Sequence, residues 1–166
     1  MGMIACYMEA DKKLIDRLKK LSEDDLFDKI EELLENCKSY DMDKMWDGLH
    51  FILTGISACT PIENNLLSEA IAGTTTFSGD PDSDYIAYIY PERLIQILEK
   101  LDQFDINDAL TDFSPRNLAR NQIYPTIWYE ENKEDLKKEL ISEFDALKNF
   151  YREMTETQKG VIVSIY

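Results

Sequence analysis

The chain has 166 residues, a length that suits one domain able to bury a hydrophobic core. Its 33 acidic residues outnumber 18 basic ones, and the net charge of −15 disfavours binding to phosphate backbones or anionic lipid surfaces. The hydrophobic content of 44% favours a globular fold over disorder.

The first part of the chain predicts one short strand and two helices. Residues 3–8 suit an opening strand, and apolar residues repeat at helical spacing over 14–21. Ser22 is a candidate N-cap for the next helix, whose first turn carries three acids, which is favourable at the positive end of the helix dipole. The outer face of this helix, within residues 23–35, is acidic, and it is either a solvated face or a docking surface for a basic partner. Its acids are Asp24, Asp28, Glu31, Glu32 and Glu35.

The central helix is the most informative element, and we expect it to begin with Asp43 as its cap and to end at Gly55. It contains the single histidine of the chain and one of its two tryptophans. At about 100° per residue, Asp43, Asp47 and His50 share one narrow face, with Trp46 at its border.

The second part of the chain alternates irregularly between helices and strands. Because helices dominate and strands are few, we predict a single helix-rich α+β domain with a small sheet, spanning residues 1–166. We expect, in chain order, a loop-rich segment at 56–83 with a short helix at 66–71, a strand buried on both faces at 85–90, helices that begin at Pro91 and Pro115, an extended aromatic segment at 123–129, a long helix at 136–154 and a final strand at 161–166.

Asp43, Asp47 and His50 are the candidate chemical groups. Two carboxylates beside an imidazole suit general acid/base catalysis, and they are also a sound ligand set for a divalent ion. The structural alternative is that Asp43 caps the helix, Asp47 binds a neighbouring segment and His50 is a satisfied boundary histidine. This alternative is preferred, because a single Asp/His pair is a weak signal.

The aromatic segment at 123–129 is the second candidate. Tyr124 and Trp128 are large, rigid side chains beside Pro125, so they would be anchors if exposed and core if buried. We favour the core, and we expect Trp128 to be partly exposed because two glutamates follow Tyr129.

Two other patterns fail on inspection. Asp80, Asp82 and Asp84 are spaced like the start of a calcium loop, but Tyr85 and Pro91 stand where an EF-hand needs glycine and glutamate. The segment 73–79 has two glycines but no lysine, so it is no phosphate-binding loop. We therefore predict that the stretch with Asp80, Asp82 and Asp84 is an acidic turn.

The cysteines indicate neither a metal site nor a redox pair. Cys6, Cys37 and Cys59 are widely spaced and form no Cys-x-x-Cys motif. We expect reduced thiols in a cytoplasmic protein, since the sequence shows no signal peptide and no apolar run long enough to span a membrane. No metal and no cofactor are predicted.

Three stretches resemble the YfbM-like family of bacterial proteins. They are the start Met1-Gly2-Met3-Ile4, the central motif Asp43-Lys44-x-Trp46-Asp47-x-Leu49-His50-Phe51-x-Leu53-Thr54-Gly55, and Ile123-Tyr124-Pro125. The resemblance spans essentially the whole chain in order. It implies a single small α+β domain without an assigned activity, and it would place a shared site at Asp43, Trp46, Asp47 and His50, with Tyr124 adjacent.

Three functions compete for this sequence. The first is a binding protein whose acidic surface engages a basic protein, as an immunity protein masks a toxin. The second is a small hydrolytic enzyme that uses Asp47 and His50. The third is a ligand-binding protein with an aromatic pocket of Trp46, Tyr124 and Trp128. We favour the binding protein, because it needs only the charge pattern that the sequence already has.

Overall fold

A five-stranded antiparallel sheet organises the part of the chain that the computed structural model describes, residues 2–166. The strand order is β2-β1-β5-β4-β3. The first and last strands in sequence pair over their full length, from Ala5 opposite Ile165 to Ala10 opposite Gly160, so the two ends of the chain meet at the centre of the sheet. The strands are β1 (Ala5–Ala10), β2 (Ser39–Asp41), β3 (Thr75–Thr76), β4 (Tyr85–Ile89) and β5 (Gly160–Ile165).

Local signals start and end several of the helices. Ser22 caps the second helix, since its Oγ accepts from the Asp25 N–H. Pro91 and Pro115 occupy first positions of their helices, where the missing N–H costs nothing. Gly55 ends the central helix with a φ of 84°. The helices are α1 (Lys12–Leu18), α2 (Glu23–Leu34), α3 (Trp46–Thr54), α4 (Leu66–Ala72), α5 (Pro91–Gln103), α6 (Ile106–Ala109), α7 (Pro115–Arg120) and α8 (Lys133–Glu156).

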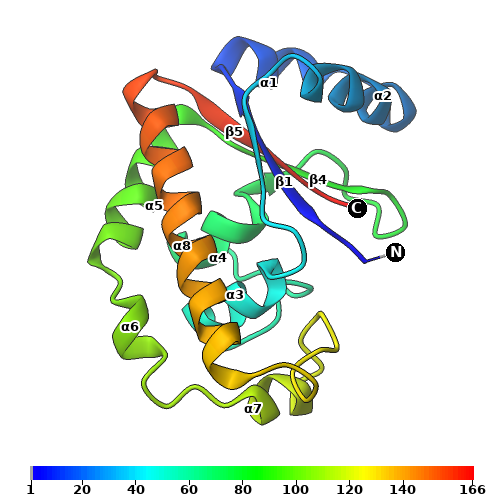
Figure 1. The fold of residues 1–166 in the computed structure, drawn as a ribbon. Helices are drawn as coiled ribbons and strands as arrows, with labels where there is room; N and C mark the ends of the chain where they lie inside the picture. The colour runs from blue at the N-terminus through cyan, green and yellow to red at the C-terminus, as the bar shows by residue number, and fades with distance from the viewer. Residues whose placement is uncertain (1) are drawn as a thin grey trace.

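The two faces of the sheet support two separate cores. Side chains alternate along each strand, so Tyr7 and Val163 point to one face while Met8 and Ile162 point to the other. Tyr7 and Val163 belong to the large core with α3–α8, whereas Met8 and Ile162 belong to a small core with α1 and α2. Figure 1 shows α1 and α2 on one side of the sheet and the α3, α4, α5 and α8 layer on the other.

A cleft lies on the α1–α2 side of the sheet, at the edge of the small core. Met8, Ile162 and Tyr88 form a row across the strands that lies within the small core. In the next row toward the carboxyl end of β5, Ser164 pairs with Ile86, and these two buried residues line the cleft beside α2. The cleft is therefore floored by the sheet and bounded by α2.

Two buried tyrosines connect the large core to α4. The hydroxyl of Tyr7 donates to the Ile71 carbonyl at 2.9 Å, and that of Tyr151 on α8 donates to the Ala70 carbonyl at 2.6 Å. Burial raises the pKa of both phenols, so they remain neutral donors. These bonds fix the position of α4, which carries a partner of the central motif.

The predicted fold class is confirmed as a single helix-rich α+β domain with one sheet. The opening strand begins at Ala5 rather than at residue 3, and β2, β3 and α6 were not expected. The prediction that 123–129 is extended is wrong: the segment folds into consecutive turns after a cis Tyr124–Pro125 bond. Among residues 2–166, none of the helices has the length and apolar character that crossing a membrane requires.

Gly48 provides a test of the packing in the large core. A Cβ atom at this position would lie 2.6 Å from Cη2 of the buried Trp128. We expect Gly48→Ala to lower the free energy of unfolding by about 1–2 kcal/mol, because overpacking outweighs the better helix propensity of alanine. Urea unfolding measures the change. Gly79→Ala is the control, since a Cβ atom there would have no neighbouring atom within 4 Å; equal stability of the two variants would contradict this packing.

Candidate functional site

The carboxylate of Asp47 is a buried acceptor that joins three parts of the chain. Asp47 lies in the first turn of α3 and is 1% exposed. Its Oδ1 accepts from the Ser57 hydroxyl at 2.9 Å and from the Ala58 N–H at 2.7 Å. Its Oδ2 accepts from the Tyr124 N–H at 2.8 Å. Asp47 therefore holds the loop after α3 and the 123–129 segment against the helix.

The imidazole of His50 is also buried, and both of its nitrogens have partners. Its Nδ1 lies 2.8 Å from the Ile56 carbonyl, which can only accept, so Nδ1 carries the proton. Its Nε2 then accepts from the Ser68 hydroxyl on α4 at 2.7 Å. The Ser68 oxygen in turn accepts from the Ile62 N–H at 2.9 Å. Burial lowers the pKa of His50 and outweighs the opposing effects of the Ile56 carbonyl and of Asp47, so the ring is neutral.

These contacts form two polar clusters beside α3, Asp47 with the half-buried Ser57 and His50 with Ser68, which we together call the buried polar network. A serine hydroxyl on an imidazole resembles a nucleophile with its base, but Ser68 and His50 are both 0% exposed. A substrate has no access to them in this structure. Sequence reasoning missed Ser68, because nothing in its local sequence shows that α4 packs beside the histidine.

Asp43 does not belong to this network. It is exposed and adopts a φ of 51°, a left-handed conformation, before α3 begins at Trp46. Its carbonyl accepts from the Ala5 N–H at 3.3 Å, so Asp43 lies in the turn that leads from β2 into α3. Met45 occupies the cap position without a side-chain hydrogen bond. The predictions that Asp43 caps the helix and shares a face with Asp47 are therefore wrong.

The aromatic candidates pack around the same helix. Trp46 donates from Nε1 to the Met3 carbonyl at 3.2 Å and stacks on Tyr124, with ring centroids 5.5 Å apart. Trp128 is 2% exposed and donates to the Ile123 carbonyl at 2.7 Å, so the prediction that it is partly exposed is wrong. Tyr129, which is 69% exposed, is the residue that faces solvent.

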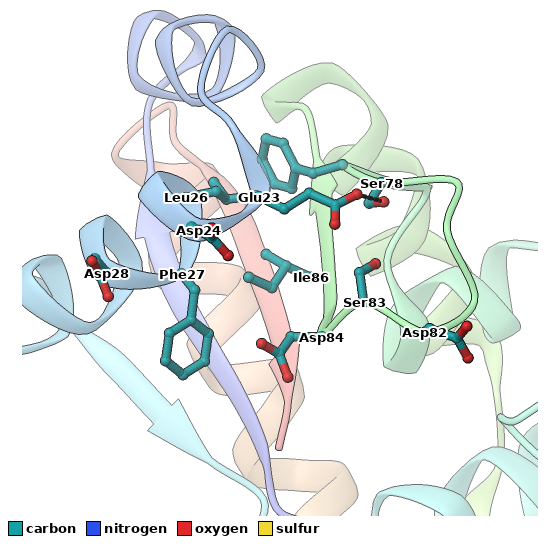
Figure 2. Close-up of a pocket in the computed structure, with 11 residues that line it drawn as sticks. Glu23, Asp24, Leu26, Phe27, Asp28, Ser78, Asp82, Ser83, Asp84 and Ile86 are labelled. Atoms are coloured by element: carbon teal, nitrogen blue, oxygen red, sulfur yellow. Dashed lines mark hydrogen bonds between the residues drawn. The ribbon is translucent and has the colours of Figure 1, made fainter.

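An acidic cleft lies elsewhere, between α2 and the segment that leads into β4 (Figure 2). Its volume is about 470 Å³. Apolar side chains form part of the lining, and no lysine or arginine contributes to it. We call this the acidic cleft; the residues that line it are Glu23, Asp24, Leu26, Phe27, Asp28, Phe77, Ser78, Asp82, Ser83, Asp84 and Ile86.

Most of the carboxylates in the acidic cleft have no partner of their own. Glu23 accepts from the Ser78 hydroxyl, and this bond joins α2 to the opposite wall (Figure 2). Within residues 2–166, no salt bridge and no side-chain hydrogen bond involves the carboxylates of the other four acids. Carboxylates from two elements that lie together without a cation repel one another, so a bound cation would be stabilised there. These four are Asp24, Asp28, Asp82 and Asp84.

Only one wall of this cleft could be predicted from the sequence. The acidic face of α2 was identified from its pattern, but Asp82 and Asp84 were interpreted only as part of an acidic turn. Neither Asp47 nor His50 lines the acidic cleft. Within residues 2–166, no three of the histidine, cysteine and acidic side chains gather closely enough to hold a metal ion.

The fold and its sites define a small α+β protein with a closed polar interior and an open acidic cleft. The chain belongs to the family described as a domain of unknown function (DUF1877), whose family model matches residues 1–164. It is 32% identical to protein YfbM of Escherichia coli (strain K12) over 155 residues, which are 93% of this chain and 92% of the relative.

A solved structure confirms the fold. The crystal structure of YfbM from Escherichia coli, described as a protein of unknown function, superimposes with a TM-score of 0.80 at 27% sequence identity. The match covers 98% of this chain and 99% of that one. The predicted resemblance to the YfbM-like family is thus confirmed, and so is the expectation that the family brings no assigned activity.

Replacement of Asp47 tests the buried polar network. An asparagine side chain keeps the shape but turns one acceptor oxygen into a donor, which then faces a backbone N–H. We expect Asp47→Asn to lower the free energy of unfolding by about 2–3 kcal/mol in urea titrations. The same change at the exposed Asp43 is the control, and it should stay within about 0.5 kcal/mol of the wild type. A similar, small effect of both substitutions would contradict the assignment.

Protonation of His50 makes stability depend on pH. The unfolded chain binds a proton at His50 below about pH 6.5, whereas the folded chain does so only at lower pH. The stabilisation is therefore complete above pH 6.5 and is lost as the pH falls toward the folded-state pKa, by up to about 1.4 kcal/mol per pH unit. His50→Gln should remove this contribution, so its free energy of unfolding should change less between pH 7 and pH 5 than that of the wild type. Equal slopes would contradict a buried neutral imidazole.

Proposed function

We propose that this protein binds a basic protein partner through the acidic cleft and the adjoining outer face of α2. The observation that carries the proposal is the set of unpaired carboxylates around an apolar floor, with no lysine or arginine in the lining. An oxyanion or a nucleic acid would be repelled by this lining. A cationic segment of a protein would complement both its charge and its floor.

The net charge of the whole chain supports the same function. The electrostatic field of a protein with a net charge of −15 steers basic partners toward it and repels a second copy of the same chain. Single exposed ion pairs contribute only about 0–1 kcal/mol each, so affinity needs several of them together with apolar burial. The acidic cleft offers both in one place, as the mode of an immunity protein that masks a basic toxin requires.

We place this function in the cytoplasm. Cys6, Cys37 and Cys59 are free thiols, which suits a reducing compartment. A partner in the same compartment would be a basic cytoplasmic protein or a protein that enters from outside.

Charge reversal at the cleft tests the proposed function. The test variant combines Asp28→Lys with Asp84→Lys and reverses two charges in the cleft. The control variant combines Glu99→Lys with Asp145→Lys and makes the same change in net charge elsewhere. Both control residues are exposed and form no salt bridge within residues 2–166. The wild type and both double variants are immobilised and exposed to extract from the source organism at low salt. A protein retained by the wild type is then purified, and its dissociation constant is measured with each bait at low and high salt.

The proposal predicts a basic partner that binds the wild type and the Glu99/Asp145 variant alike. Binding should weaken at high salt, because the charges are exposed. The Asp28/Asp84 variant should bind roughly tenfold more weakly or worse, since two attractions become repulsions. Equal affinity for all three baits, or affinity that does not change with salt, would contradict the proposal.

A further inference from the structure

A second, more apolar cavity adjoins the acidic cleft. This cavity has a volume of about 370 Å³ and shares Phe27, Asp84 and Ile86 with the acidic cleft. We call it the apolar lobe. Its other lining residues come from α2, from β4 and from the carboxyl end of β5, and they are Ile30, Glu31, Leu34, Glu35, Tyr85, Ser164, Ile165 and Tyr166.

The apolar lobe is suited to an apolar side chain. Ile30 and Leu34 of α2 supply an aliphatic wall, and Tyr166, which is 49% exposed, lies in the same lining. Its acids are exposed: Glu31 lies on α2, and Glu35 caps the end of that helix. An occupant that fills this lobe removes aliphatic and aromatic surface from water, which is worth about 1.5–3 kcal/mol for a leucine-sized side chain.

The neighbouring acidic cleft is suited to a long cationic side chain. Phe27 and Phe77 contribute aromatic rings to the same lining as the carboxylates of Asp28 and Asp84. An arginine can lay its aliphatic stem on such rings and direct its guanidinium to the carboxylates. Since Phe27 and Asp84 line both cavities, the apolar and cationic groups of one ligand would sit side by side.

We propose that the two cavities together hold a protein segment in which an arginine stands next to a large apolar residue. The inference rests on the proposed function and specifies the segment of the partner that is recognised. Charge complementarity selects this occupant: a second copy of the chain is repelled by its own −15 charge. A polyamine would satisfy the carboxylates, but it has no group to fill the apolar lobe.

Short labelled peptides test the proposal by fluorescence anisotropy. The first peptide alternates leucine with arginine, the second replaces each leucine by serine, and the third replaces each arginine by serine. Spermine serves as a cation without an apolar group. The proteins are the wild type, Asp28→Asn with Asp84→Asn, Phe27→Ala, and Tyr166→Ser, which alters an exposed side chain.

The leucine–arginine peptide should bind the wild type roughly tenfold more tightly than each of the other peptides and spermine. Tyr166→Ser should weaken binding of this peptide but not of the serine–arginine peptide. The Asp28/Asp84 variant should weaken both. Phe27→Ala, which removes the ring shared by the two cavities, should weaken the leucine–arginine peptide more than Tyr166→Ser does and should also weaken the serine–arginine peptide.

The outcomes separate this inference from the proposed function. Equal binding of the leucine–arginine peptide, the serine–arginine peptide and spermine would overturn the recognition of an apolar neighbour and leave a general acidic binding surface in place. If the Asp28/Asp84 variant bound the arginine peptides as tightly as the wild type does, both this inference and the proposed function would be overturned. Tight binding of the leucine–serine peptide would also overturn both, because the cleft would then take a neutral segment.

Discussion

The central strands of the sheet are apolar on both faces, and this constraint shapes the whole molecule. Both faces must be covered, since the large core and the small core each draw side chains from β1, β4 and β5. The long α8 and its neighbours pack on one face. The α1–α2 pair packs on the other, where the buried row at Ile86 and Ser164 forms the floor of a cleft beside α2. The position of the candidate binding site thus follows from how α2 packs against this face of the sheet.

The same fold explains why an acid and an imidazole lie in the core without facing solvent. The irregular segments around α3 have backbone groups that no helix or strand satisfies. Asp47 accepts from two backbone N–H groups, and His50 donates to the carbonyl of Ile56. Within residues 2–166, every buried side-chain nitrogen or oxygen has a partner. Residues of the types that catalysis uses are here occupied in holding loops, whereas the unpaired carboxylates are at the surface.

The sequence predicted those elements whose signals are local. Ser22, Pro91, Pro115 and Gly55 mark helix ends by their own chemistry, and the structure has helix ends at each of them. The two-residue strand β3 has no such signal, because its existence depends on pairing with Tyr88 and Ala87.

The candidate site could be predicted only in part, because only some of its features have a local signal in the sequence. The period of 3.6 residues placed Asp47 and His50 close together, but it also included Asp43, which adopts a left-handed φ in the turn before α3 begins. The acidic face of α2 could be predicted from the helical spacing of its acidic residues. The cleft that this face forms with Asp82 and Asp84 could not be predicted, because it depends on how α2 lies over the sheet.

The most direct measurement is a map of backbone amide shifts in ¹⁵N-labelled protein as the leucine–arginine peptide is added. The account predicts that the shifted amides cluster in α2, in residues 77–86 and in residues 164–166. Shifts centred on α3 and residues 123–129, or spread evenly over the acidic surface, would contradict the claim that the cleft beside α2 is the binding site.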